Sequence, residues 1–242
     1  DARLVADLLA VDPVGLGGVH LQCGPGPVRE AWLGRLQQAC EGESHGVQHT
    51  TLRRLPQHAD DSRLIGGLDL TATLQEGRPK LQKGLLAELD GHILVCPMAE
   101  RLPRRVVSHL TQALDRQEVR LERDGLSSVH TSRFGLVAID EADAAADESP
   151  IEAALGERLA FQLNLQGIDW RLTGTDGFAD PLNEFNGDDD VPCPAEMSAA
   201  RAALSGITVS DAVTDSLVQA AVALGIASLR VPWWAVQATR AL

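Results

Sequence analysis

A glycine-rich turn near the start of the chain has the layout of a phosphate-binding loop. An apolar strand over residues 18–23 leads into Gly24 and Gly26, and a helix-like segment follows. In the loop pattern G-x-x-x-x-G-K-[ST], backbone N–H groups and a lysine hold phosphates, and the hydroxyl binds magnesium. Here Pro27 occupies the lysine position and Val28 occupies the hydroxyl position. The framework of such a loop is present, and the residues that do its chemistry are missing.

Arg29 is the nearest positive charge, one or two positions later than the lysine would stand. Proline also removes a backbone donor that would otherwise point at phosphate. We therefore interpret Gly24, Gly26 and Arg29 as a degenerate phosphate loop and expect it not to function. A divergent loop that uses Arg29 in place of lysine remains open as an alternative.

The second half of such a site is an apolar strand that ends in acidic residues, which hold magnesium and polarise the attacking water. The strand predicted over residues 92–96 ends instead in Cys96-Pro-Met-Ala-Glu100. No carboxylate stands at its tip, and we expect Glu100 to come too late in the chain to reach that point. Two halves of one catalytic centre are missing together, which indicates an activity lost from a retained fold.

The acidic composition narrows the classes of partner. The 242 residues include 34 acidic and 21 basic ones, for a net charge of -13. This balance argues against nucleic acid or an anionic membrane as the main partner. No apolar run approaches the roughly 20 residues that span a bilayer, so we expect a cytoplasmic protein with no membrane span. The cysteines are scattered and the histidines form no ligand pair, so we predict reduced thiols and no metal site.

Strands alternate with helices over residues 1–175, which predicts an α/β domain with a largely parallel sheet flanked by helices. An insertion over about residues 64–88 and a hairpin over about residues 118–132, with Asp124-Gly125 at its turn, interrupt this alternation. Strands are predicted over residues 18–23, 47–55, 92–96, 133–139 and 161–165. A first helix is predicted over residues 27–39, and a second begins at Pro103 and has Val106, Val107, Leu110 and Leu114 on one face. A third is predicted through Ile151, Leu155 and Leu159.

The composition changes in the last third of the chain. Residues 176–194 are rich in Pro, Gly and acidic side chains and are predicted to form a solvated linker. Residues 195–242 are predicted to form a small all-helical domain, with Ser210 as the N-cap of its second helix and Pro232 at the start of its third. In the second helix Val213, Leu217, Ala221 and Leu224 form an apolar stripe.

Two segments carry a resemblance to a known family. The stretch Ile65-Gly-Gly-Leu-Asp-Leu70 through Pro79, followed by Gly84-Leu-Leu-Ala-Glu88, resembles the AAA+ module of magnesium chelatases. The degenerate loop, Cys96-Pro-Met98 and Gly225-Ile-Ala-Ser-Leu-Arg230 look like the D subunit of the bacteriochlorophyll-type enzyme. The resemblance covers most of the chain. It implies an AAA+ core with a helical lid, and a chain that is only the N-terminal module of such a subunit.

The resemblance also implies roles for individual residues. The asparagine that ends the family's sensor-1 strand is replaced by Asp140 or Glu141, which puts γ-phosphate sensing in doubt. Glu157-Arg158 matches the family's arginine-finger pair, so Arg158 is expected to act in trans on a neighbour's nucleotide, and Arg230 matches the sensor-2 arginine. A guanidinium brought to a γ-phosphate is worth roughly 10³–10⁵ in rate in related enzymes.

Taken together, the resemblance implies a non-hydrolysing AAA+ subunit of magnesium chelatase, a ligase that forms metal–nitrogen bonds. No cofactor is expected on this chain, because MgATP would be held by the ATP-hydrolysing AAA+ partner. The assembly would couple hydrolysis to Mg²⁺ insertion into protoporphyrin IX on a large porphyrin-binding subunit. The alternatives are a divergent phosphate-loop NTPase with weak turnover of its own and a pure scaffold. In the scaffold, the fold would survive only as a docking surface. Independently of these hypotheses, the non-functional alternative for Arg158 is a surface ion pair with Glu157 or Glu152, and for Arg230 a surface arginine at a helix end.

Overall fold

A five-stranded parallel sheet forms the centre of the molecule. The computed structural model describes residues 1–41, 50–56, 58–123, 126–142, 151–168 and 194–242. The strand order is β2-β5-β8-β1-β9, and all four neighbouring pairs are parallel. The parallel α/β sheet predicted from the sequence is confirmed. The strands are β1 Gly18–Gln22, β2 Leu52–Arg54, β5 Ile93–Cys96, β8 Gly135–Asp140 and β9 Phe161–Asn164.

Both faces of this sheet are buried, which explains the continuous apolar runs of its central strands. Successive side chains of β8 alternate between two hydrophobic clusters. Val137 and Ile139 pack with helices α1 (Ala2–Val11) and α2 (Pro27–Cys40) on one face. Leu136 and Ala138 pack with α6 (Arg104–Arg116) on the other face. Because a core packs on each face, the sheet is rigid. Side chains at the two edges where its strands begin and end are therefore held in fixed positions.

The predicted helix through Ile151, Leu155 and Leu159 is wrong in extent. The structure has one helical turn there, α7 Ala153–Gly156, and buries Ile151 and Leu159 outside it. After the helix, the N–H groups of Arg158 and Leu159 make turn bonds to carbonyls three residues back. The N–H of Ala160 then bonds to the carbonyl of Leu16, where the chain joins the sheet. The strand predicted over residues 47–55 is likewise reduced to β2, and residues 42–49 lie outside the described part of the chain.

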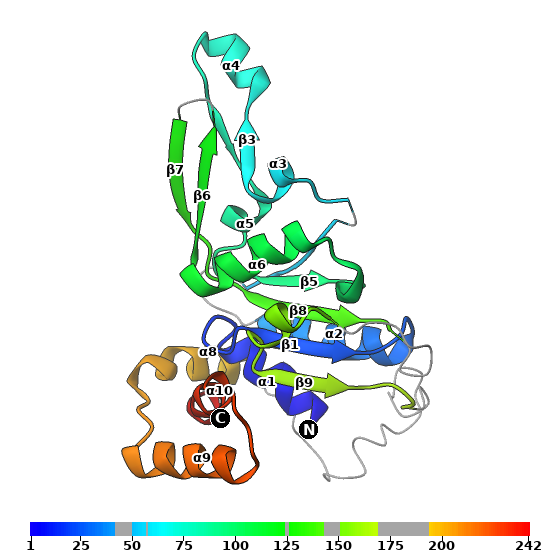
Figure 1. Cartoon of the computed structure of the whole chain (residues 1–242), viewed down its shortest axis with the longest axis vertical. Coiled ribbons are helices and arrows are strands. Elements are labelled where there is room, and N and C mark those ends of the chain that lie inside the picture. Colours follow the sequence, from blue (N-terminus) through cyan, green and yellow to red (C-terminus); the bar gives the residue numbers. More distant parts are fainter. Residues whose placement is uncertain (42–49, 57, 124–125, 143–150, 169–193) are drawn as a thin grey trace.

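Two small antiparallel sheets project together from the central sheet as one arm (Figure 1). The insertion contains α3 Asp61–Leu64, β3 Gly66–Leu68, α4 Leu70–Glu76, β4 Leu81–Lys83 and α5 Leu85–Glu88. Its strand pair β3–β4 is an element that the helix and turn signals of the sequence did not predict. The hairpin consists of β6 Glu118–Arg123 and β7 Leu126–Thr131, and its turn at residues 124–125 lies outside the described residues.

Four helical segments follow at the C-terminal end of the described chain: α8 Pro194–Ala203, η3 Leu204–Gly206, α9 Asp211–Ala223 and α10 Arg230–Ala241. They lie beside the edge of the sheet at which the strands begin (Figure 1). The Ser210 hydroxyl caps α9 as predicted, but only Ala221 of the predicted apolar stripe is buried, and Val213 and Leu224 are exposed. The linker predicted at residues 176–194 lies outside the described residues except for Pro194.

Polar contacts fix these helices against the core. The Arg201 side chain of α8 donates to the carbonyls of Ala10 and Ala39 at 2.8 and 2.7 Å, at the C-terminal ends of α1 and α2. A cation at a helix C-terminus also interacts favourably with the helix dipole. Arg240 of α10 donates to the Asp12 carboxylate at 2.7 Å, directly after α1. These contacts fix α8 and the C-terminal end of α10 against the ends of α1 and α2.

Candidate functional site

The degenerate phosphate loop lies at the carboxyl edge of the sheet, which is the edge where its parallel strands end. Gly24 and Gly26 lie between the end of β1 and Pro27, which is the first residue of α2. Gly26 has φ +155°, a value that L side chains rarely adopt, and no heavy atom lies within 4 Å of an added Cβ at either glycine. Two of the loop positions, Pro25 and Pro27, have no backbone N–H to offer a phosphate. The loop keeps its turn and has lost backbone donors.

Arg29, the one cation that the sequence offers near this loop, is engaged with a carboxylate of the same chain. Its Nη1 donates to Oε1 of Glu141 at 2.6 Å. The side chains are only 14% and 20% exposed, so water screens this ion pair weakly. Glu141 follows β8 directly, so the pair connects the first turn of α2 to the end of a central strand. The guanidinium that could replace a lysine is neutralised from within.

The expectation that Glu100 lies too far along the chain is wrong. Met98 adopts a left-handed backbone conformation with φ 50°, and the 3-10 turn η1 Ala99–Arg101 brings Glu100 back toward the sheet. Its Oε2 accepts a hydrogen bond from the backbone N–H of Glu141 at 3.2 Å, and its side chain is only 4% exposed. A carboxylate therefore does reach this edge, where it supports the backbone of the residue that binds Arg29.

Asp140, at the acidic sensor-1 position, is also satisfied within the chain. Its Oδ2 lies 3.1 Å from Nε2 of His20 on β1, and its Oδ1 accepts from the Ala142 N–H at 2.9 Å. Both His20 and Asp140 are buried. Sequence reasoning missed His20, although a histidine inside an apolar strand could have suggested a buried polar partner. The charged side chains of this edge are engaged within the chain, and residues 23–28 of the loop line a cavity of about 490 Å³ beside Glu141.

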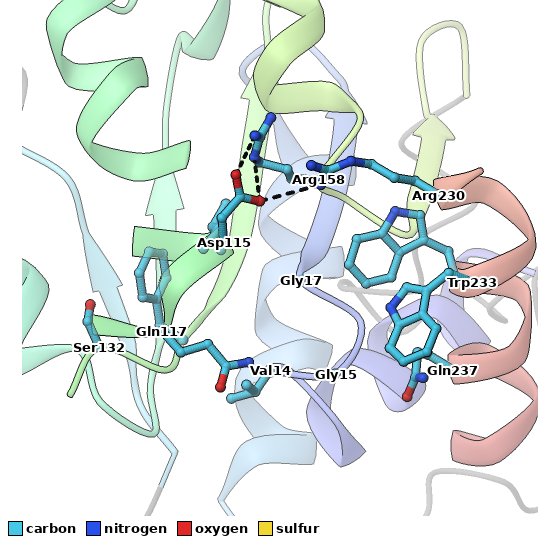
Figure 2. Close-up of a pocket in the computed structure, with 13 residues that line it drawn as sticks. Val14, Gly15, Gly17, Asp115, Gln117, Ser132, Arg158, Arg230, Trp233 and Gln237 are labelled. Carbon is cyan, nitrogen blue, oxygen red and sulfur yellow. Dashed lines mark hydrogen bonds and ion pairs between the residues drawn. The ribbon is translucent and has the colours of Figure 1, made fainter. Parts of the chain in front are cut away.

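At the opposite edge of the sheet, where its parallel strands begin and which we call the amino edge, two arginines contact one carboxylate (Figure 2). Arg158 follows α7, Arg230 begins α10, and Asp115 lies in the last turn of α6. Nε of Arg158 donates to Oδ1 of Asp115 at 2.9 Å and its Nη2 donates to Oδ2. Nη1 of Arg230 lies 3.4 Å from Oδ1 of the same carboxylate. Arg158 also donates to the carbonyl of Ala154.

The predicted alternative partners of Arg158, Glu157 and Glu152, are wrong. The Glu152 carboxylate lies 3.3 Å from Nε of Arg104, and the partner of Arg158 is Asp115, 43 residues away in sequence. Hydrogen bonds from Arg158, followed by its charge and then by that of Arg230, lower the pKa of the Asp115 carboxyl against the opposing effect of burial. The carboxylate is therefore ionised at neutral pH, and a single negative charge serves two cations.

The arginines line a pocket of about 220 Å³ with Trp233, Trp234 and Gln237 of α10. Gly17, directly before β1, has φ +67°, and an added Cβ would lie 2.3 Å from the Arg158 carbonyl oxygen. Nε1 of Trp234 donates to the Glu157 carbonyl at 3.1 Å. Close approach of the backbone at Gly17 and the hydrogen bond of Trp234 together fix the chain that carries Arg158.

The two edges are separated by the length of β1. Gly17 contacts the Arg158 backbone before the strand begins, and Gly24 follows its end. At about 3.3 Å per extended residue, the strand puts roughly 20 Å between the arginines and the degenerate loop. Arg158 and Arg230 are therefore brought together, and neither is directed at the loop of its own chain.

Within the described residues, no group of three His, Cys, Asp or Glu side chains could hold a metal ion. Within the same ranges, no helix has the length and apolar character needed to cross a bilayer. The chemistry that this arrangement offers is the binding of an anion by two guanidinium groups.

The chain was compared with protein-family models and with known proteins. No protein-family model matches the chain. The chain is 34% identical over 234 residues to the magnesium-chelatase 60 kDa subunit of Cereibacter sphaeroides, covering 97% of this chain and 34% of that subunit. It is 26% identical over 196 residues to the magnesium-chelatase 38 kDa subunit of the same organism, covering 77% of this chain and 58% of that subunit.

Two solved structures share the fold. A crystal structure of a predicted ATPase from Cytophaga hutchinsonii matches with a TM-score of 0.62 and 14% identity over 97% of this chain and 72% of that one. A chain from a cryo-EM-based model of the complex between subunits BchI and BchD of magnesium chelatase matches with a TM-score of 0.54 and 22% identity, over 100% of this chain and 91% of that one. The chain spans about a third of the length of the 60 kDa relative. It shares its fold with these two structures and is similar in sequence to magnesium-chelatase subunits.

Proposed function

We propose that this chain is the non-hydrolysing AAA+ part of a magnesium-chelatase D-type subunit. It assembles with an ATP-hydrolysing AAA+ subunit and helps couple ATP hydrolysis to Mg²⁺ insertion into protoporphyrin IX on a porphyrin-binding large subunit. The reaction is a metal–nitrogen ligation in (bacterio)chlorophyll synthesis. The observation that carries the proposal is the contrast between a carboxyl edge whose Arg29 is neutralised by Glu141 and an amino edge that presents Arg158 and Arg230.

The carboxyl edge supports the absence of hydrolysis. Phosphoryl transfer needs a cation on the β- and γ-phosphates and a metal held by a hydroxyl and an acidic side chain. The lysine and hydroxyl positions are Pro27 and Val28, and Arg29 is neutralised by Glu141. Asp140 is turned toward His20. The lysine and hydroxyl positions are replaced, and Nη1 of Arg29 and both oxygens of Asp140 are engaged within the chain, whereas Nε of Arg29 and Oε1 of Glu100 have no hydrogen-bond partner among the described residues.

The amino edge supports action on a neighbour's nucleotide. A guanidinium fork binds two phosphate oxygens at once and stabilises the charge that develops in the transition state. Arg158 lies roughly 20 Å from its own loop, a distance set by about 3.3 Å per residue of β1, so its phosphate must come from another chain. We therefore assign Arg158 to the trans-acting arginine finger and Arg230 to a second cation beside it.

The relatives support the choice of subunit and partner. Identity is higher to the 60 kDa subunit than to the 38 kDa subunit of the same organism, at 34% against 26%. One structural neighbour comes from a complex of two different chelatase subunits. We propose the ATP-hydrolysing AAA+ subunit, which carries MgATP, as the direct partner. A cytoplasmic location remains a prediction.

Calorimetric titration of MgATP into the isolated chain, together with a phosphate-release assay, tests the absence of hydrolysis. We expect no turnover and no micromolar binding. Micromolar binding with turnover that Arg29→Ala abolishes would instead establish the divergent NTPase.

Co-sedimentation with the ATP-hydrolysing subunit, with and without MgATP, tests the partnership. We expect association that MgATP strengthens, because the nucleotide supplies the phosphate that the two arginines bind. If a complex in which both Arg158 and Arg230 are replaced by alanine keeps full chelatase activity, the chain acts only as a scaffold.

A further inference from the structure

Asp115 occupies the position in which an anionic ligand of Arg158 would lie. The Nε and Nη2 groups of Arg158 bind its two oxygens side by side, and Arg230 adds a third donor at 3.4 Å. The same fork geometry matches two oxygens of a phosphate. A carboxylate held by two arginines from separate elements therefore resembles a phosphate group in the same place (Figure 2).

The ion pairs at this position can exchange. The side chains of Asp115 and Arg230 are 39% and 40% exposed, so water screens their attraction. Arg158 is more buried, at 17%, and it has a second hydrogen bond to the Ala154 carbonyl that does not involve Asp115. Removal of the Asp115 carboxylate would therefore leave the Arg158 guanidinium in place and without its counter-ion.

The electrostatics of the pocket favour one anion at a time. Among its described lining residues, the charged ones are Asp115, Arg158 and Arg230, which sum to one positive charge. A terminal phosphate carries up to two negative charges, and its entry beside an ionised Asp115 would bring like charges together. The pocket, which Trp233 and Trp234 help to line, has a volume of about 220 Å³, enough for a phosphate group. The carboxylate must leave the arginines before phosphate can bind both.

We propose that Asp115 is an internal competitor for the phosphate site formed by Arg158 and Arg230. In the free chain its carboxylate occupies the site, and the terminal phosphate of a neighbour's nucleotide displaces it. The phosphate's role as the natural ligand rests on the proposed function, whereas the competition itself is a property of this chain. Asp115 is a positioning residue, because it contacts neither substrate nor nucleotide once it is displaced.

The test uses inorganic tripolyphosphate and the isolated chain at constant ionic strength. Calorimetry and the fluorescence of Trp233 and Trp234 would report binding to wild type, Asp115→Asn and Asp115→Ala. We expect both variants to bind at least tenfold more tightly than wild type, because the competing anion is gone. Asp115→Asn combined with Arg158→Ala should lose this gain, because the fork that binds phosphate is missing.

The control is Asp215→Asn on the exposed part of α9, which removes one negative charge at a distance from the pocket. Any general charge effect in this acidic chain would appear equally in that variant. Two folded Asp115 variants that bind tripolyphosphate no more tightly than the Asp215→Asn control would overturn the proposal.

The two proposals fail separately. If Arg158→Ala lowers the activity of the assembled complex but Asp115→Asn does not change anion affinity, the competition is wrong and the proposed function stands. If Asp115→Asn binds tripolyphosphate more tightly but Arg158→Ala leaves complex activity unchanged, the anion site exists and its assigned role is wrong.

Discussion

The two edges of the central sheet use charge in opposite ways. At the carboxyl edge Arg29 pairs with Glu141 and His20 with Asp140, and all four side chains are largely buried. At the amino edge two cations share one partly exposed carboxylate, Asp115. Breaking a buried pair is costly because it leaves an uncompensated charge, whereas an excess of cation at the surface is available to an outside anion. We propose that the same fold has lost a nucleotide site at one edge and kept a phosphate-binding site at the other.

The largest expected effect on stability lies at the carboxyl edge, in the His20–Asp140 pair. Replacing His20 by leucine leaves the buried Asp140 carboxylate with one fewer partner, and we expect the free energy of unfolding to fall by about 3 kcal/mol. Urea denaturation measures this loss. Asp140→Asn in the same background removes the charge and should recover part of it. A loss below about 0.5 kcal/mol would show that this edge does not depend on its internal pairs.

A smaller effect is expected for Arg29 and Glu141. A double-mutant cycle of Arg29→Ala and Glu141→Ala should give a coupling free energy of about 1–2 kcal/mol, because both side chains are largely buried. The midpoint of thermal unfolding should not rise when MgATP is added to wild type. A coupling near zero, together with stabilisation by MgATP, would show that Arg29 serves a nucleotide after all.

At the amino edge the expected effect on stability is smaller again. Arg158→Ala should change the free energy of unfolding by about 0–1 kcal/mol, because Asp115 is partly exposed and the pair is screened. Urea denaturation of this variant beside His20→Leu makes the comparison direct. A larger loss in Arg158→Ala than in His20→Leu would reverse the contrast between the edges.

The smallest effect is a shift in titration. Because the pKa of Asp115 is lowered in the folded chain, its contribution to stability is present above its unfolded pKa and is lost as pH falls through the folded one. In a variant with Arg158→Ala and Arg230→Ala, NMR titration of the Asp115 carboxyl should show its pKa rising toward about 3.9, the unperturbed value. An unchanged pKa would mean that the arginines do not hold this carboxylate in solution.

The sequence predicts the elements that carry their own local signals. Continuous apolar runs identified β5 and β8, and prolines marked the starts of α2 and α6. The sequence also predicts a loss of the phosphate chemistry, because Pro27 and Val28 occupy positions whose residue types are fixed by their role, and this stays a prediction. Local signals are sufficient wherever the relevant neighbours lie within a few positions along the chain.

The pairing of the site could not be predicted, because it depends on contacts between distant segments. Asp115 lies 43 positions from Arg158 and 115 from Arg230, and nothing in its own helix distinguishes it from another solvated acid. Glu100 reaches the carboxyl edge because Met98 has a left-handed backbone conformation. A methionine gives no sequence signal for that conformation, whereas a glycine would. Tertiary packing decides both.

The most direct test compares Arg158→Ala with Arg104→Ala in the complex assembled with the ATP-hydrolysing and porphyrin-binding subunits. Arg104 is 94% exposed and pairs with Glu152, so its variant removes an arginine without touching the pocket. We predict that Arg158→Ala lowers MgATP hydrolysis and Mg²⁺ insertion at least tenfold, within the roughly 10³–10⁵ range that an arginine finger can contribute. Arg104→Ala should retain full activity, and both variants should co-sediment normally. Undiminished activity in an Arg158→Ala complex that assembles normally would contradict the assignment of the amino edge to a neighbour's phosphate.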